Sequence, residues 1–281
     1  MDPVWIDTHC HLDAPEFSGV LPAIIAAAKE KNVRAILLPT VKASDFKNVN
    51  MLVDQYQHDI PGLVYTLGIH PLYTNQAHEQ DIAILDEYIQ KALSDLRFVG
   101  IGEIGLDYFV EGLDPQKQEY FFHAQLDLAQ KYELPVILHV RRSQDAVLKA
   151  LRRRSIFGGI AHAFNGSFQQ AEQFIDLGFK LGFGGAATYE RALQIRRLLA
   201  ELPLGSIVTE TDSPDIPPAW LKQEGIPFNE PAFVARIAIA LAAIRGVDEK
   251  EFASTVWQNA MQALPRWATL CNNNPQITLA S

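Results

Sequence analysis

The segment "QKQEYFFHAQLDLAQKYELPVILHV" (116–140) contains the unit that decides the fold. Its first part, 116–133, carries apolar side chains at helical spacing, and Asp114-Pro115 just before it is a typical helix start. Its last part, 135–140, is a short and continuous apolar run. A strand of this kind that alternates with helices pairs in parallel with its neighbours and is buried on both faces. The segment therefore predicts a repeating unit of a parallel α/β protein.

Similar units recur along the chain. The helix-like segments include 21–32 and 168–178, and the β-rich apolar runs lie at 4–9, 34–40, 63–70, 98–106, 135–140, 158–164, 180–185 and 206–212. Eight such units in 281 residues predict an α/β fold of the (β/α)8 or TIM-barrel type, with an open doubly wound sheet as the alternative. No Gly/Ser/Pro-rich linker divides the chain, so we predict a single domain over residues 1–281, in which helices within 231–266 cover the barrel.

The composition limits the possible partners. Lys and Arg number 24 and Asp and Glu number 33, so the formal charge is 24 − 33 = −9. This charge argues against a broad basic surface that wraps nucleic acid, although bound divalent metals can supply local positive charge. Two cysteines cannot build a disulfide framework, and we interpret Cys10 as a packing residue. Neither a signal peptide nor a membrane span is evident, so we expect a cytoplasmic protein; no protein partner is evident either.

Ionisable residues gather where the predicted strands end. His9 and His11 alternate at the end of the first run, so both point to one side. The other candidates end the fourth, fifth, sixth and eighth runs, and they are Glu103, His139, His162 and Asp212. Each could alone be a buried, hydrogen-bonded core residue or a turn residue. Together they would cost several kcal/mol each when buried unpaired, whereas one or two divalent ions would satisfy all of them.

Five sequence blocks support this metal site. "DTHCHLD" (7–13), "GEIGLDY" (102–108), "LPVILHVR" (134–141), "HAFNGS" (162–167) and "TETDSP" (209–214) resemble, in this order, the signature blocks of the TatD family of metal-dependent hydrolases. "FNEP" (228–231) resembles a further block, so that the match covers most of the chain. Ala163 and Asn165 stand where the family commonly has Cys and Ser, and Phe228 stands where it commonly has Arg. Neither departure affects a predicted ligand, but the loss of the arginine bears on substrate specificity.

The resemblance implies a role for each candidate. His9, His11 and Asp212 would hold one divalent ion, His139 and His162 a second, and Glu103 would bridge the two. Zinc, manganese, magnesium, nickel and iron are not distinguished by the sequence. Two neighbouring ions can share a hydroxide and stabilise both the attacking and the leaving oxygen of a phosphodiester. Asp212 could also act as general base and then acid, or serve only as a ligand.

Further candidates surround this site. Asp7 and Glu210 precede ligands by two residues, so we expect hydrogen bonds that orient the histidines, with buried ion pairs as the alternative. Candidate substrate contacts are His70, which could also be a structural turn residue, Arg141, which could form a loop salt bridge, and Asn165. The glycines of "GFGGAAT" (182–188) could approach a phosphate or allow close packing. "LRRRS" (151–155) could be a solvated helix end or a nucleic-acid contact.

The resemblance indicates a metal-dependent deoxyribonuclease that trims single-stranded DNA from its 3′ end. A first alternative keeps the same site but hydrolyses a small ester, lactone, amide or aminoacyl ester, because similar metal sites attack carbon as well as phosphorus. A second alternative is a non-catalytic metal-binding scaffold, which would bind metal without turnover.

Overall fold

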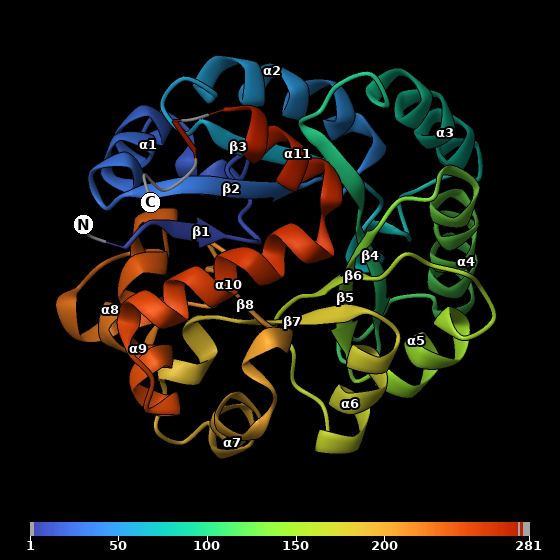
Figure 1. Cartoon of the computed structure of the whole chain (residues 1–281). Coiled ribbons are helices and arrows are strands. Elements are labelled where there is room, and N and C mark those ends of the chain that lie inside the picture. The colour runs from blue at the N-terminus through green and yellow to red at the C-terminus, as the bar shows by residue number, and fades with distance from the viewer. Residues whose placement is uncertain (1–2, 275, 278–281) are drawn as a thin grey trace.

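The computed structural model describes residues 3–274 and 276–277. Its centre is a parallel sheet of eight strands in the order of the sequence, which curves into a nearly closed barrel (Figure 1). The strands are β1 Trp5–Asp7, β2 Val33–Pro39, β3 Gly62–Leu67, β4 Phe98–Asp107, β5 Val136–Arg141, β6 Gly159–Ala161, β7 Phe179–Phe183 and β8 Ile207–Thr209. The predicted (β/α)8 class is thus confirmed, and the doubly wound alternative is excluded by the strand order.

Main-chain hydrogen bonds bring the last strand back to the first. The Thr8 N–H donates to the Thr209 carbonyl at 3.0 Å, and the Asp212 N–H donates to the His9 carbonyl at 2.8 Å. Beyond the two strands, Cys10 pairs with Ser213 in an isolated parallel bridge. The segment that carries His9 and the segment that carries Asp212 therefore lie side by side, although they are two hundred residues apart in the sequence.

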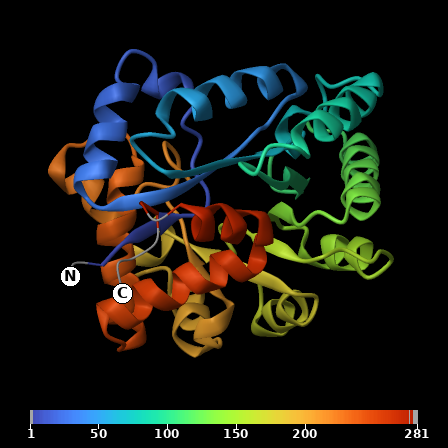
Figure 2. The ribbon, with the colours of Figure 1, turned by 45° about the horizontal axis from the view of Figure 1, so that its top comes forward.

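Helices form the outer layer of the barrel, as the turned view in Figure 2 shows. They are α1 Leu21–Glu30, α2 Phe46–Tyr56, α3 Gln80–Ala92, α4 Pro115–Tyr132, α5 Gln144–Leu151, α6 Phe168–Asp176, α7 Leu193–Glu201, α8 Ala219–Glu224 and α9 Val234–Arg245. Two residues mark helix ends in the ways typical of their types. Asp114 accepts hydrogen bonds from main-chain N–H groups in the first turn of α4, and Gly178 follows α6 with a φ of +86°. Among the described residues, no helix combines the length and the apolar character needed to cross a membrane.

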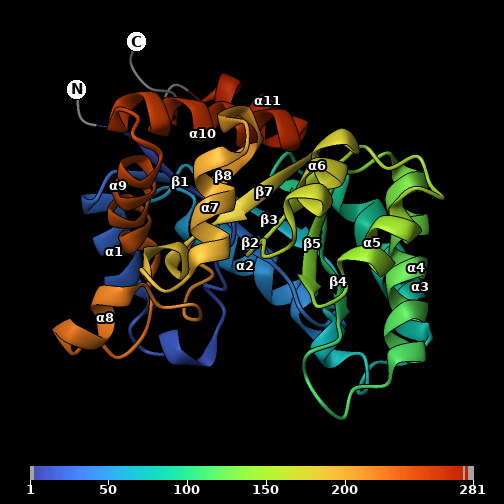
Figure 3. The same ribbon diagram turned by 90° about the horizontal axis from the view of Figure 1, so that it is seen from below.

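The last two helices, α10 Glu249–Ala263 and α11 Pro265–Asn273, lie across the end of the barrel where the strands begin (Figure 3). Their side chains bind main-chain carbonyls at strand starts: Trp267 Nε1 donates to Gly62 at 2.9 Å, and Asn259 Nδ2 donates to Ile207 at 2.8 Å. The C-terminal helices thus cover the barrel as predicted, but only at this end. The end where the strands finish stays free of them.

Several strands end before the predicted runs do. Strands β1, β6 and β8 have three residues each, so the ligand candidates on them follow the strands rather than lying in them; these are His9, His11, His162 and Asp212. Strand β4 runs to Asp107 and its pairing with β5 is irregular between Ile101 and Ile104, which places Glu103 in the middle of the strand. The prediction placed Glu103 near the end of a strand over 98–106, and the observed strand ends one residue later. The irregular pairing beside Glu103 was not visible in the apolar pattern.

Candidate metal centre

The predicted ligands meet around the carboxylate of Glu103. Its Oε2 lies 3.1 Å from Nε2 of His9 and 3.6 Å from Nε2 of His11. Its Oε1 lies 2.9 Å from Nε2 of His162 and 3.1 Å from Nδ1 of His139. The two oxygens of one buried carboxylate therefore face different histidine nitrogens, and Nε2 of His70 also lies 3.2 Å from Oε1. This is the arrangement in which a glutamate can bridge two ions.

Asp212 completes the group on the His9 side. Its Oδ1 lies 3.5 Å from Nε2 of His9 and 3.6 Å from Nε2 of His11. Its backbone has a φ of +56°, in the left-handed region that few non-glycine residues adopt. Asn229 holds the adjoining loop, because its Nδ2 donates to the carbonyls of Thr211 and Asp215 at 2.8 and 3.0 Å. The "FNEP" segment thus fixes the loop that presents Asp212.

The donor set fits divalent ions. Three clusters offer ligand atoms that all lie within 4.8 Å of one another: His9, His11 and Glu103; His9, His162 and Asp212; His70, Glu103 and His139. Ligand atoms bound at 2.0–2.1 Å around one tetrahedral ion lie about 3.3 Å apart, close to the separations found here. Mixed imidazole and carboxylate donors suit transition metals better than calcium. The number and the identity of the ions do not follow from the donors.

The charges of the centre favour a cation as well. Burial alone would raise the pKa of Glu103, but His70, His162 and His9 hold it well below its usual value. Burial lowers the pKa of His162, yet the adjoining Glu103 carboxylate outweighs burial and raises that pKa to about 10. Burial also lowers the pKa of His9 and raises the pKa of Asp212. Glu103 therefore stays ionised and draws positive charge to this point, either as a proton or as a metal ion.

His70 lies inside the centre and is buried. Its Nδ1 accepts the Leu72 N–H at 3.1 Å, and its Nε2 lies 3.2 Å from Oε1 of Glu103. Because Nδ1 accepts, the neutral ring carries its proton on Nε2 and donates it to Glu103. The same residue precedes the short helix Pro71–Tyr73 and caps it. The interpretation of His70 as a turn residue thus finds its contact in the structure, while its role as a substrate contact stays a prediction.

Asp107 was missed by the sequence analysis. Its Oδ2 lies 2.9 Å from Nε2 of His139, and its Oδ1 accepts the N–H groups of Phe109 and Val110 at 2.8 and 3.0 Å. Burial would raise its pKa, but the bond to His139 and the two N–H bonds lower it to about 2. This carboxylate therefore fixes the ring of His139 so that Nδ1 points to Glu103. The available signal was the spacing of four residues from Glu103, which places both on one side of a strand.

Asp7 and Glu210 lie beneath the ligands, as expected, but act differently. Asp7 accepts the main-chain N–H groups of His9 and Thr211 at 3.2 and 2.9 Å, so that it fixes the backbone rather than a histidine ring. Glu210 accepts the Ala163 N–H at 2.5 Å and has Oε1 3.9 Å from Nδ1 of His162. Burial raises the pKa of Asp7 to about 7 and that of Glu210 to about 8.

The glycines after β7 make room for Glu210. A Cβ added to Gly182 would lie 2.1 Å from Oε2 of Glu210, and one added to Gly184 would lie 2.6 Å from the Glu210 carbonyl. The close-packing interpretation of "GFGGAAT" therefore explains these two glycines without a phosphate.

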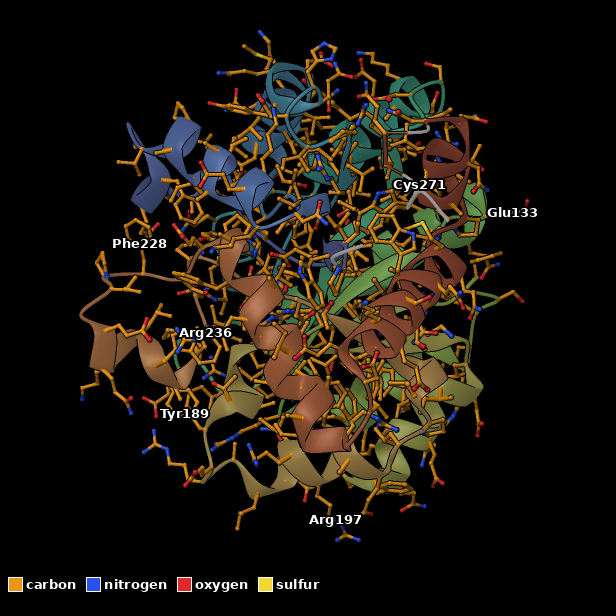
Figure 4. The ribbon with its side chains drawn as sticks, turned by 60° about the vertical axis from the view of Figure 1, so that its left-hand side comes forward. Glu133, Tyr189, Arg197, Phe228, Arg236 and Cys271 are labelled. Atoms are coloured by element: carbon orange, nitrogen blue, oxygen red, sulfur yellow. The ribbon has the colours of Figure 1, made fainter. Side chains whose placement is uncertain are left out.

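The remaining candidates lie at or near the surface. Arg141 and Asn165 are exposed, and the guanidinium carbon of Arg141 lies 3.9 Å from the centre of the Phe109 ring. Phe228 packs edge-on against Phe17 with 5.5 Å between the ring centres. Figure 4 shows Phe228 on one side of the molecule, well away from Cys271 of α11. Cys10 is buried with Sγ 3.0 Å from Oγ of Ser213, as expected of a packing residue.

A parallel barrel with buried histidines and carboxylates where its strands finish defines a class of metal-dependent hydrolases. The family model described as TatD related DNase matches residues 6–265, so the chain belongs to the TatD family. It is 40% identical to an uncharacterized metal-dependent hydrolase, YjjV, of Escherichia coli strain K12, over 91% of this chain and 95% of that one. It is 36% identical to a metal-dependent hydrolase of Haemophilus influenzae, over 92% and 98%.

Solved structures agree with the assignment to the TatD family. The crystal structure of the TatD homologue YJJV from Escherichia coli superposes with a TM-score of 0.86 at 36% identity, covering 93% of this chain and 98% of that one. A TatD family hydrolase from Entamoeba histolytica, at 24% identity and a TM-score of 0.81, shares the fold. The protein is thus a TatD family metal-dependent hydrolase.

Proposed function

We propose that the protein is a deoxyribonuclease that removes nucleotides from the 3′ end of single-stranded DNA. The observation that carries the proposal is Glu103, whose two carboxylate oxygens face separate groups of histidine nitrogens. This arrangement supports a centre of two ions, which suits phosphodiester hydrolysis. The description of the family model as TatD related DNase supports a DNA substrate.

The side chains of the centre would hold the ions in two groups. His9, His11 and Asp212 would bind one ion, and His139 and His162 the other, with Glu103 between them. When bound, such ions acidify a water molecule and stabilise the charge that builds up on the phosphate oxygens. Asp107 would keep the His139 ring in its binding orientation, and the proton of His70 on Nε2 would hold Glu103 in place.

Asp212 is suited to move the proton. Its side chain is 12% exposed and that of His11 17%, whereas the side chains of His9 and Glu103 are at most 2% exposed. The side chain of His139, at the other oxygen of Glu103, is 14% exposed, so Asp212 is one of several ligands that reach the open face of the centre. In the metal-free protein, burial raises the pKa of Asp212 above the usual value. Asp212 would take the proton of the attacking water and deliver it to the 3′ oxygen that leaves when the P–O bond breaks.

A gel assay tests the proposal. A single-stranded oligonucleotide labelled at its 5′ end is incubated with the protein and magnesium, manganese or zinc. We expect a ladder that shortens from the 3′ end, and a loss of about 10³-fold or more in rate for Asp212→Asn. Asp215→Asn is the matched control, because this exposed aspartate lies in the same loop and outside the centre. An intact oligonucleotide with a metal-loaded protein would contradict the proposal.

A second candidate has a specific observation in its favour. Phe228, against Phe17, puts an apolar side chain where the family commonly has an arginine, and the chain carries a net charge of −9. Both features suit a small ester, lactone, amide or aminoacyl ester better than a polyanion. Turnover of such a substrate by a protein that leaves DNA intact would favour this candidate. Metal binding without any turnover would instead favour a scaffold.

A further inference from the structure

An exposed aromatic side chain lies beside the metal centre with two arginines. Phe109, in the segment between β4 and α4, is 44% exposed. The guanidinium carbons of Arg141 and Arg142 lie 3.9 and 4.6 Å from the centre of its ring. Neither arginine has a carboxylate partner among the salt bridges of the described residues. Two guanidinium groups thus meet one exposed ring, which makes this a positively charged place on a chain with a net charge of −9.

This cluster is at the functional end of the barrel. The segment between β4 and α4 projects at the end opposite α10 and α11 (Figure 3). Arg141 ends β5, two residues after His139, which is about 6.6 Å along an extended strand. A group bound at Arg141 would therefore be about one nucleotide away from a bond cleaved at the metal centre.

The position of the ring is coupled to the centre by a single carboxylate. Asp107 accepts the Phe109 N–H with Oδ1 and binds Nε2 of His139 with Oδ2. The Tyr108 N–H also donates to the Arg141 carbonyl at 2.9 Å, which ties the two segments together. Although Phe109 is exposed, its backbone is thus held in a fixed relation to a ligand of the centre. A binding surface that must place a substrate bond accurately requires such a fixed relation.

We propose that Phe109, Arg141 and Arg142 form the subsite for the nucleotide next to the cleaved bond of single-stranded DNA. The base stacks on the Phe109 ring or on a guanidinium plane, and the guanidinium groups bind the flanking phosphate. Stacking accepts any base, so this subsite selects single strands without selecting sequence. The inference rests on the proposed function, since it names how the same site takes its substrate.

Binding to a probe that resists cleavage tests this subsite. The metal-loaded protein is titrated against a fluorescein-labelled oligothymidylate of ten nucleotides with phosphorothioate linkages, and anisotropy is followed. We expect Phe109→Ala to weaken binding by about 5- to 100-fold and Phe109→Tyr to keep it. Arg141→Gln and Arg142→Gln should each lower the slope of log Kd against log salt by about 0.7, if each binds one phosphate.

Matched controls lie at the other end of the barrel. Phe157, 55% exposed, precedes the start of β6, and Lys31, also exposed, precedes the start of β2. Phe157→Ala and Lys31→Gln should bind the probe as the wild type does. Equal losses for these controls would overturn the subsite and favour general electrostatics. If the wild type cleaves DNA but Phe109→Ala and both arginine variants bind normally, this inference fails while the proposed function stands. If the wild type neither binds nor cleaves single strands, both fail.

Discussion

The two ends of the barrel use buried polar groups in opposite ways. Where the strands begin, the side chains of Asn259, Arg266 and Trp267 donate to main-chain carbonyls of β8, β4 and β3. These donors and acceptors satisfy one another. Where the strands finish, Nδ1 of His9, Nδ1 of His162 and Oε2 of Glu210 are buried without a hydrogen-bond partner among the described residues.

This difference separates stability from function. Unsatisfied buried polar atoms cost free energy, so a fold retains them where something else compensates for the cost. At the end closed by α10 and α11, these side-chain donors find their acceptors in main-chain carbonyls of the chain itself. At the open end, a cation held by Nε2 of His9 and Nε2 of His162 would neutralise the buried carboxylate of Glu103. The predictions below test this separation by changing one end and measuring at both.

The largest effect is expected at the centre of the open end. Glu103→Gln removes the charge between the two histidine pairs, and we expect bound metal to fall below the wild-type level and the hydrolytic rate to fall by about 10⁴-fold or more. Plasma mass spectrometry measures the metal content. The metal-free variant should remain folded, although it loses the attraction between Glu103 and the protonated His162. Glu111→Gln, an exposed glutamate in the segment after β4, is the control.

Retention of two metal equivalents by Glu103→Gln would contradict the bridging role. A variant that unfolds instead of losing metal would show that the open end contributes more to stability than the comparison allows.

At the closed end, Trp267→Ala should destabilise the fold by about 3–5 kcal/mol, because the side chain is fully buried and its Nε1 donates to Gly62. Urea unfolding measures the loss. The variant that remains folded should bind the same amount of metal per molecule as the wild type. Trp267→Phe, which keeps most of the apolar volume, should lose less. Loss of metal without loss of stability would break the separation of the two ends.

Two glycines allow the same comparison with one methyl group. Gly182→Ala would place a Cβ 2.1 Å from Oε2 of the buried Glu210, so we expect a cost of about 1–3 kcal/mol and weaker metal binding. Gly205 lies before β8 at the closed end, and a Cβ added there meets nothing within 4 Å, so Gly205→Ala should leave stability and metal binding unchanged. Urea unfolding and metal titration of the two variants measure these two properties. Equal behaviour would mean that Glu210 is free to move.

Much of this architecture could be predicted from the sequence, for local reasons. Each strand is a short apolar run, and all eight strands begin within two residues of their predicted first residue. The six predicted ligands meet because parallel strands bring their finishing ends together. The irregular pairing within β4, which places Glu103 in mid-strand, depends on contacts with β5 that no local pattern records. The roles of Asp107 and His70 likewise depend on neighbours from other strands.

The smallest expected effect is a dependence of metal affinity on pH, which only the open end should cause. The pKa of His162 is raised to about 10 by Glu103, so in the metal-free protein this ring is protonated at neutral pH. A metal ion binds only the deprotonated nitrogen, so binding releases a proton, and the apparent affinity rises about tenfold per pH unit below that pKa. Glu210, with its pKa raised to about 8, would release a further fraction of a proton when a cation binds nearby.

Calorimetric metal titration in two buffers of different ionisation enthalpy counts these protons. We expect about one or more released per protein at pH 7, and fewer in Glu210→Gln, which has no carboxyl proton to lose. Trp267→Ala should release the same number as the wild type, since the closed end contributes no titrating group to the centre. An affinity that does not change between pH 6 and pH 8 would mean that metal does not take the place of the His162 proton. The ion would then bind outside the group that surrounds Glu103.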